Sequence, residues 1–290
     1  MIYSQFKTFV LLAALTGALL FMGGMFGGSN GIKYALIFAF ILNGISYFFS
    51  DKIVLSMYGA QPLSREKYDW IYQIVEELCH EARLPMPKLW FVNNPMANAF
   101  ATGRNPSHAS VAITAGILEI LDQRELRGVL AHEISHIKNR DILVGSIAAT
   151  IAMAIGYLAD LARWSFFWGD RRNNRQSGVG IFGVILISIL VPLAATLIQL
   201  AITRSREYLA DESGAKHSQD PLALADALEK LHHAVPKNQK QEPSTVQAAT
   251  ASLFIVYPFS TKGLFNLFST HPPMEKRIAR LHAMAEKMMP

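Results

Sequence analysis

The chain has 290 residues, few charged side chains and a single cysteine. Because Cys79 has no second cysteine to pair with, an internal disulfide is excluded, and a reducing compartment fits. Gly178–Gly183 spells GxGxxG, but no strand pattern precedes it, so we do not expect a dinucleotide site. The net charge of +5 is not gathered into a nucleic-acid-binding motif, so nucleic acid is not an expected partner.

Hydrophobic residues make up 51% of the chain and charged residues 17%, and the hydrophobic excess lies in a few long runs. A bilayer core of ~30 Å needs about 20 mostly apolar residues per helix. Four stretches approach that length: Thr8–Phe26, Tyr34–Phe49 extended by Ile32, Ile142–Trp164 with Asp160 inside it, and Val179–Ile202 with Pro192 inside it. We therefore expect four transmembrane helices and contact with a lipid bilayer.

The first stretch could be a signal peptide, because Lys7 precedes an apolar run that ends in small residues. However, no convincing A-x-A cleavage site follows, and the second stretch comes after only the Gly-rich turn Gly27–Gly31. A hairpin of two retained helices is the favoured interpretation. The third and fourth stretches either cross fully or form a partial hairpin, since Asp160 would be costly near the bilayer centre.

Residues 132 to 136 read HEISH, which fits the HExxH pattern of zinc peptidases. On a helix, His132 and His136 lie on one face, so both imidazoles can reach one Zn²⁺ at ~2.0 to 2.1 Å. Glu133 can then take a proton from a water that the metal acidifies toward a pKa of ~7. Asp122 as N-cap, with Glu125 three residues on, supports the helix, as does an apolar face of Leu126, Val129, Leu130, Ile134 and Ile137.

A catalytic zinc normally takes three protein ligands and leaves a fourth position open, so a third ligand is expected elsewhere. Glu207 and Asp211 lie one helical turn apart on the same face, as a metal ligand and a carboxylate that orients another ligand should. The alternative is a solvated acidic turn flanked by basic residues.

The chain resembles the HtpX family of membrane metallopeptidases, which are related to the CAAX prenyl endopeptidases. The resemblance covers nearly the whole chain and is carried by four motifs: AHEISHIKNRD at 131–141, SREYLAD at 205–211, NAFATG at 98–103 and HPPMEKR at 271–277. It implies that Glu207 is the third zinc ligand and that Asp211 orients a ligand histidine, which we expect to be His136.

The resemblance also implies that His271 and Arg277 face the active site and help to hold substrate or the oxyanion of the tetrahedral intermediate. It further implies an edge strand on which substrate adds as an extra strand, formed by Asn98, Ala99, Phe100, Ala101, Thr102 and Gly103.

The expected fold is membrane α-helical plus α+β, with four transmembrane helices and a zincin-like catalytic domain in the cytoplasm. The expected parts are a transmembrane hairpin at 1–50, the catalytic domain at 51–141 and 204–290, and a second hairpin at 142–203. Within the catalytic part, a helix is expected at Gln61–Arg83 and strands at Lys88–Val92 and Ser110–Thr114.

Basic residues near the membrane ends place the catalytic segments in the cytoplasm: Lys52, Lys138, Arg140, Arg204 and Arg206. Four arginines between the third and fourth stretches oppose this orientation: Arg163, Arg171, Arg172 and Arg175. The metal ligands decide the conflict. His136 lies just before the third stretch and Glu207 just after the fourth, so one metal requires both ends on one side, close to the membrane surface.

The expected function is that of an integral membrane zinc endopeptidase. By resemblance, it acts in the bacterial inner membrane in stress response and quality control, on damaged membrane proteins and unfolded polypeptides. One rival is a prenyl-protein processing protease, which would normally carry more membrane helices. The other is a noncatalytic scaffold with structural zinc, which would have no need of Glu133 beside the metal.

Overall fold

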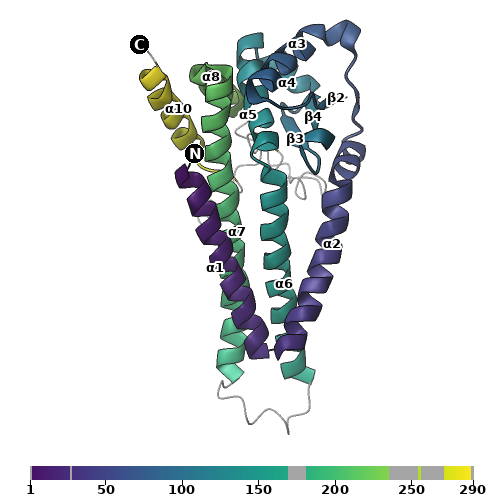
Figure 1. Ribbon diagram of the computed structural model, residues 1–290, viewed down its shortest axis with the longest axis vertical. Coiled ribbons are helices and arrows are strands. Elements are labelled where there is room, and N and C mark those ends of the chain that lie inside the picture. The colour runs from purple at the N-terminus through teal and green to yellow at the C-terminus, as the bar shows by residue number, and fades with distance from the viewer. Residues whose placement is uncertain (1, 27, 169–180, 235–253, 256–270, 289–290) are drawn as a thin grey trace. The chain divides into compact units, whose positions relative to one another are not determined.

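The structure is a computed structural model that describes residues 2–26, 28–168, 181–234, 254–255 and 271–288 (Figure 1). The chain divides into two compact units. A helical unit comprises Gln5–Ser46 and Val144–Ile202, and an α/β unit comprises Met1–Ser4, Tyr47–Leu143 and Thr203–Pro290.

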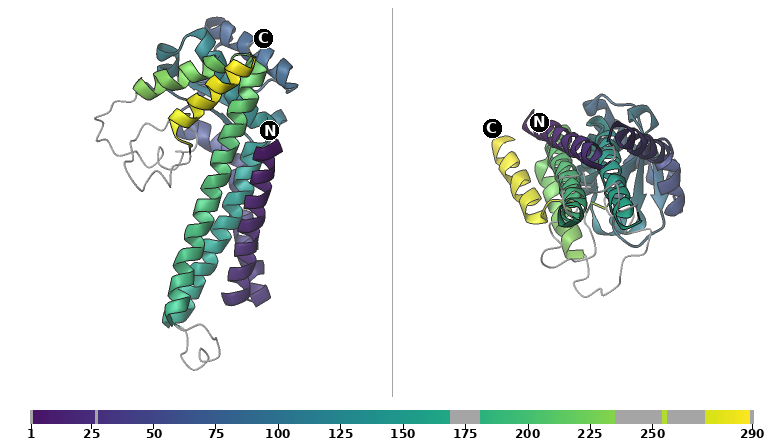
Figure 2. Two further views of the ribbon diagram at one scale, coloured as in Figure 1. Left: turned by 90° about the vertical axis from the view of Figure 1, so that its left-hand side faces the viewer. Right: turned by 90° about the horizontal axis from the view of Figure 1, so that it is seen from below.

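Four long helices contribute to the helical unit: α1 (Ile2–Phe26), α2 (Gly28–Met57), α6 (Asp141–Trp168) and α7 (Ile181–Ser218). Within this unit α1, α6 and α7 share one apolar core, and the three run alongside one another in Figure 2. That core is built largely from small and branched side chains, among them Leu15, Leu19, Ala154, Ile155, Leu158, Ala159 and Ala195. Small residues let helix backbones approach closely, which is how membrane helices commonly pack.

Three helices among the described residues are long and apolar enough to cross a membrane. The stretches are Phe6–Met25, Asp141–Trp164 and Ile185–Ser218. The expected second span, Tyr34–Phe49, lies within helix α2, which is not one of the three. The predicted count of four spans is therefore not confirmed.

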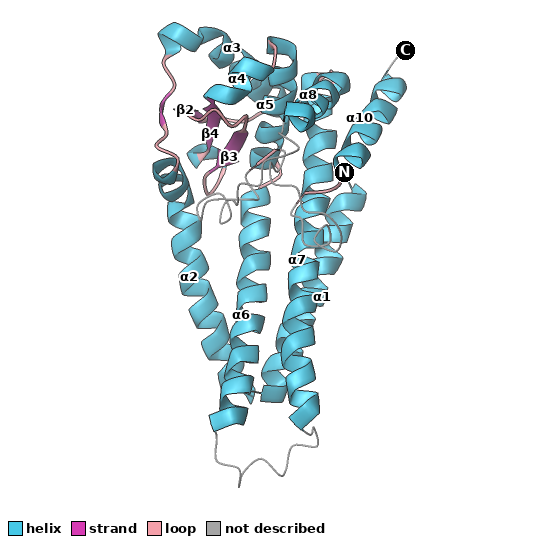
Figure 3. Ribbon diagram, turned by 180° about the vertical axis from the view of Figure 1, so that it is seen from behind, coloured by secondary structure: helices cyan, strands magenta, loops and turns pink. Residues whose placement is uncertain are grey.

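The α/β unit contains a four-stranded sheet in the order β1-β2-β4-β3, drawn in magenta in Figure 3. Strand β2 (Lys88–Val92) runs parallel to β4 (Ser110–Thr114), and β3 (Ala99–Thr102) pairs antiparallel with β4. The strands expected at 88–92 and 110–114 are confirmed. The helix expected from Gln61 instead begins at Arg65, because Gln61 and Pro62 pair with β2 as the short strand β1.

Helices α3 (Arg65–Ala82), α4 (Ala115–Ile120), α5 (Gln123–Lys138), α8 (Pro221–Ala234) and α10 (Met274–Met288) complete this unit, together with the short 3₁₀ turn η1 (Pro106–His108). The apolar positions Ile71, Val75 and Leu78 form one stripe of α3 that enters the core shared with α5, α8 and the sheet. Helix α8 packs against both α5 and α10, and α8 and α10 lie side by side in Figure 2. This packing fixes α5 between the sheet and α8.

Candidate metal centre and active site

Helix α5 carries the HEISH motif, and its N-terminus is fixed by a capping box. The Asp122 side chain accepts from the Glu125 N–H at 2.9 Å, and the Glu125 side chain accepts from the Asp122 N–H at 3.0 Å. The predicted cap is therefore confirmed. His132 and Glu133 are buried, and the rings of His132 and His136 meet edge to face with centroids 4.6 Å apart.

Helix α7 presents Glu207, Asp211 and Gly214 on one face, because positions four and seven residues apart lie on the same side of a helix. Gly214 lies against α5. A Cβ at this position would lie only 3.0 Å from the His132 backbone nitrogen, which is tighter than nearly all real contacts. The missing side chain thus allows α7 to approach α5 closely, and Glu207 is held near the two histidines.

His132, His136 and Glu207 form a group whose potential ligand atoms all lie within 4.8 Å of one another. His136 Nε2 is 3.0 Å from His132 Nε2 and 3.4 Å from Glu207 Oε1, while His132 Nε2 is 3.7 Å from Glu207 Oε2. Ligand atoms ~2.0 to 2.2 Å from a tetrahedral zinc lie about 3.3 Å apart. Two imidazoles and one carboxylate are also a donor set that zinc accepts. The three residues could therefore hold a metal ion.

The charges around this group favour a divalent cation. The group and its surroundings contain four carboxylates, from Glu207 itself and from Glu133, Asp211 and Asp141. Two guanidinium groups contact these carboxylates, Arg206 at Asp141 and Arg277 at Asp211. When these carboxylates are ionised and the histidines are neutral, two negative charges remain. Buried charge without a partner is costly, and one divalent ion would balance it.

Each histidine of the group contacts a different carboxylate through its outer nitrogen. His132 Nδ1 lies 2.9 Å from Asp211 Oδ1, and His136 Nδ1 lies 2.6 Å from Asp141 Oδ2. The expectation that Asp211 orients His136 is therefore wrong, because the face of α7 that carries Asp211 meets α5 beside His132. Asp141 was missed by the sequence analysis. It could have been found as the acidic residue in the first turn of α6, the helix that follows HEISH.

Glu133 is held by the backbone of the edge strand. The Ala101 N–H donates to Glu133 Oε2 at 2.8 Å. Burial raises the pKa of Glu133, although the neighbouring histidines act in the opposite direction. A carboxyl group with a raised pKa is better suited to accept and release a proton near neutral pH.

The pKa of His136 reflects two opposing influences. Burial disfavours the charged imidazole, but the hydrogen bond to Asp141 and the negative charge of Glu207 outweigh burial and raise the pKa to about 9. A proton would therefore compete with a cation for this side chain.

His271 and Arg277 reach the same group from the C-terminal part of the chain. His271 Nδ1 lies 2.9 Å from Glu207 Oε2. Arg277 is fully buried, and its Nε and one terminal nitrogen donate to the two oxygens of Asp211 at 2.9 and 2.7 Å. This pairing raises the pKa of Arg277. The expected roles of both residues in holding substrate or an oxyanion stay predictions.

The segment from Asn98 to Gly103 lies at the edge of the sheet. Among the described residues, β3 pairs with β4 alone, and the Ala101 N–H points away from β4 toward Glu133. The Asn98 side chain accepts from the Ile255 N–H at 3.0 Å, and the Ile255 carbonyl accepts from Arg277 at 3.3 Å. The structure thus brings the edge strand, the candidate base and the potential metal ligands into one site within the α/β unit.

A buried HExxH helix with a third carboxylate ligand on another helix defines a metallopeptidase of the zincin type. Residues 65–285 match the model of peptidase family M48. The chain is 54% identical over 279 residues to a protein named Protease HtpX homolog from Aquifex aeolicus (strain VF5), across 95% of this chain and 91% of the relative. It is 53% identical over 283 residues to the homolog of Syntrophobacter fumaroxidans, across 97% and 99% of the two chains.

The fold is also similar to the crystal structure of S. mikatae Ste24p, with a TM-score of 0.59 and 19% identity. The match covers 97% of this chain and 66% of that longer chain, so this chain spans just under two thirds of its length. The chain belongs to peptidase family M48. The expectation of an HtpX-like membrane metallopeptidase is thereby confirmed at the level of class and family.

Proposed function

We propose that this protein is a zinc-dependent endopeptidase of a cell membrane that cleaves exposed, extended segments of damaged or unfolded membrane proteins. The observation that carries the proposal is the convergence of His132, His136 and Glu207 beside Glu133, within one buried site. Family membership supports hydrolysis of peptide bonds, and the charge balance of the site supports a divalent ion.

His132 Nε2, His136 Nε2 and the Glu207 carboxylate would hold the zinc. When bound, zinc supplies Lewis-acid chemistry, lowering the pKa of water toward ~7 and polarising the scissile carbonyl. Glu133 then takes the proton from the attacking water and later delivers it to the leaving amine. Its contact with the Ala101 N–H fixes the direction from which the proton is taken. The base would contribute about 10² to 10⁴ in rate.

Strand β3 provides a surface for extended substrate. Among the described residues it pairs only with β4, and its outward-pointing Ala101 N–H is bound by Glu133. We infer that an extended substrate would pair along this side of β3. Main-chain pairing of this kind recognises backbone and tolerates many side chains. It requires an unfolded segment, which agrees with substrates that have lost their folded structure.

The finer membrane arrangement is part of the proposal. We infer four spans, with α2 as the fourth, a bacterial inner-membrane location and a catalytic unit that faces the cytoplasm. Basic residues beside the apolar stretches support this orientation, as does the position of the metal ligands just outside the third and fourth stretches in sequence. We propose the role in stress response and quality control from the family resemblance carried by the sequence motifs, and the proposed binding of extended chain agrees with it.

The proposal can be tested with the purified chain in detergent or nanodiscs. We expect cleavage of unfolded casein and of an unfolded membrane protein, loss of cleavage on addition of a zinc chelator, and recovery when stoichiometric zinc is returned. A natively folded form of the same substrate should be cleaved far more slowly. Zinc-loaded protein that cleaves none of these polypeptides would contradict the proposed function.

A further inference from the structure

Each of the two histidines of the site is contacted by an aspartate, and each aspartate is in turn bound by an arginine. We call these two sets of contacts the first and the second Arg–Asp–His chain. In the first, Arg277 binds Asp211, and Asp211 contacts His132. In the second, Arg206 binds Asp141, and Asp141 contacts His136. The second chain joins three helices, because His136 lies on α5, Asp141 begins α6 and Arg206 lies on α7.

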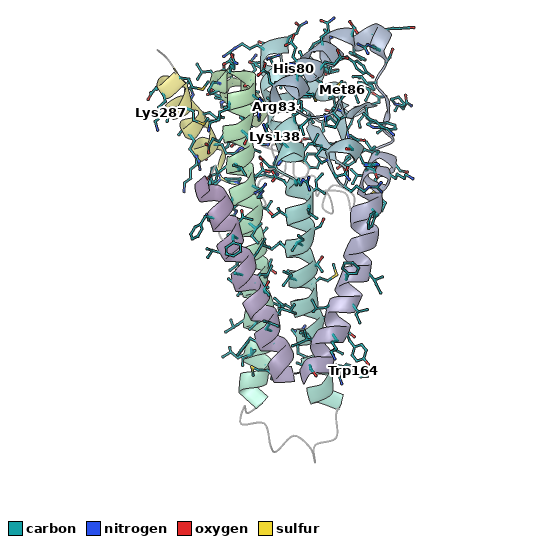
Figure 4. The ribbon with its side chains drawn as sticks, viewed as in Figure 1. His80, Arg83, Met86, Lys138, Trp164 and Lys287 are labelled. Atoms are coloured by element: carbon teal, nitrogen blue, oxygen red, sulfur yellow. The ribbon has the colours of Figure 1, made fainter. Side chains whose placement is uncertain are left out.

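A break in the backbone between α5 and α6 allows Asp141 to contact His136. Lys138, labelled in Figure 4, is the last residue of α5, and Arg140 has a φ of +54°. Residues other than glycine rarely adopt this left-handed conformation. In an unbroken helix, a residue five positions after His136 would lie about 140° around the axis, facing away from it. The break at Arg140 instead returns Asp141 to within 2.6 Å of the imidazole.

The contacts of Arg206 fix this junction further. Its guanidinium group binds Asp141 Oδ1, and it also donates to the Asn139 carbonyl at 2.7 Å, at the end of α5. The Asp141 and Arg206 side chains are only 8% and 9% exposed, so each buried charge is stabilised by the other and would be costly alone. Each oxygen of Asp141 has its own donor: Oδ2 faces His136 and Oδ1 faces Arg206.

We propose that Asp141 and Arg206 are positioning residues for the metal ligand His136. Asp141 holds the proton of His136 on Nδ1, which leaves the lone pair of Nε2 available to a metal ion shared with His132 Nε2 and Glu207. Arg206 fixes the carboxylate that does this and ties it to the end of α5. The inference rests on the proposed zinc function, and it assigns to each histidine ligand its own aspartate and its own arginine.

Partners of this kind fix the tautomer and orientation of a ligand histidine, and their loss typically lowers metal affinity about 10- to 100-fold. Asp141→Leu removes the acceptor and keeps similar volume. Asp141→Asn keeps an oxygen that can accept from Nδ1. We therefore expect zinc affinity to fall in the order wild type, Asn variant, Leu variant, with the Leu variant lower by about 10- to 100-fold.

The experiment measures zinc affinity by competition with a chelator, and thermal stability of the zinc-free protein, on the full chain in detergent. Asp141→Leu alone leaves the Arg206 charge buried and will lower stability as well. The double variant Asp141→Leu with Arg206→Met removes both charges. It should recover much of the stability while its zinc affinity stays as low as that of Asp141→Leu. Lys216→Met serves as control, because Lys216 is an exposed cation on the same helix.

Zinc affinity and thermal stability together distinguish a positioning role from a purely structural one. Zinc affinity that stays low while stability recovers in the double variant supports the positioning role. Recovery of both together would show that the pair only stabilises the junction, and unchanged affinity in Asp141→Leu would also overturn the inference. Failure of the wild-type chain to bind zinc would overturn the proposed function and this inference with it. If the wild type binds zinc and only the variants depart from expectation, the inference alone is overturned.

Discussion

At the scale of single residues, the site contains two buried ion pairs, Arg277 with Asp211 and Arg206 with Asp141. Removing one partner of such a pair typically destabilises a protein by about 3 to 5 kcal/mol, because the other charge stays buried. Arg277 shows this most clearly. It is fully buried and binds both oxygens of Asp211, the carboxylate that also contacts His132.

His271 allows a test of the role implied by the family resemblance. If its imidazole stabilises developing negative charge, His271→Ala should lower the rate of peptide cleavage by about 10²- to 10³-fold. Zinc content should stay at the wild-type level, since the three ligands are intact. His282→Ala, an exposed histidine on α10, is the matched control. Loss of zinc in His271→Ala would instead show that the contact with Glu207 positions that ligand.

The residues of the site differ in how readily sequence could predict them. His132, Glu133 and His136 form a local pattern on one helix face, and Glu207 with Asp211 forms another, so periodicity alone brings each set together. Asp141 and Arg206 do not follow such a pattern. Their contact with the site depends on the left-handed turn at Arg140, which places residue 141 where helical spacing would not.

At the scale of elements, local signals predicted α5, β2 and β4 because caps, apolar periodicity and β-branched runs act over a few residues. The short strand β1 could not be predicted in this way. Gln61 and Pro62 are extended because they pair with Phe91 and Trp90, about 30 residues later. The pairing of α5 with α7 is likewise a long-range packing event, and Gly214 makes it possible.

At the scale of elements, we predict that a side chain at Gly214 disturbs the packing of α7 against α5. In Gly214→Ala, the new methyl group would force the α7 and α5 backbones apart by a few tenths of an ångström. Because a 1 Å misplacement can lower a rate about 10²-fold, we expect cleavage to fall by about tenfold, together with zinc affinity.

The control for this prediction is Gly145→Ala, where a Cβ would meet nothing within 4 Å. That variant should keep full activity and gain up to ~1 kcal/mol from the higher helix propensity of alanine. Wild-type zinc affinity and activity in Gly214→Ala would contradict the idea that close approach of α7 positions Glu207.

At the scale of the whole molecule, the ligands constrain the topology. If His136 and Glu207 bind one ion, as we propose, the sequences that leave α5 and end α7 must lie on the same side of the membrane. Cysteines at Lys138 and Lys216, in a Cys79→Ala background, should both react with an impermeant thiol reagent from the cytoplasmic side. Both lysines are exposed, which makes the positions accessible.

A cysteine at Asn173, between α6 and α7, supplies the contrast. It should react from the opposite side if both helices cross the membrane. Reaction from the cytoplasmic side would reduce this pair to a partial hairpin, as its flanking arginines suggest. Reaction of positions 138 and 216 from opposite sides would exclude Glu207 as a ligand, because a ~30 Å hydrocarbon core cannot be bridged by bonds of ~2 Å.

The central claim is that one zinc ion, held by His132, His136 and Glu207, is used by Glu133 for peptide hydrolysis. The most direct measurement is zinc content and peptide cleavage in parallel for wild type, Glu133→Gln and Glu207→Ala. We predict one zinc ion in wild type and in Glu133→Gln, with cleavage in that variant lower by about 10² to 10⁴, and loss of both zinc and cleavage in Glu207→Ala. Near wild-type cleavage by Glu133→Gln, or full zinc content in Glu207→Ala, would contradict the claim.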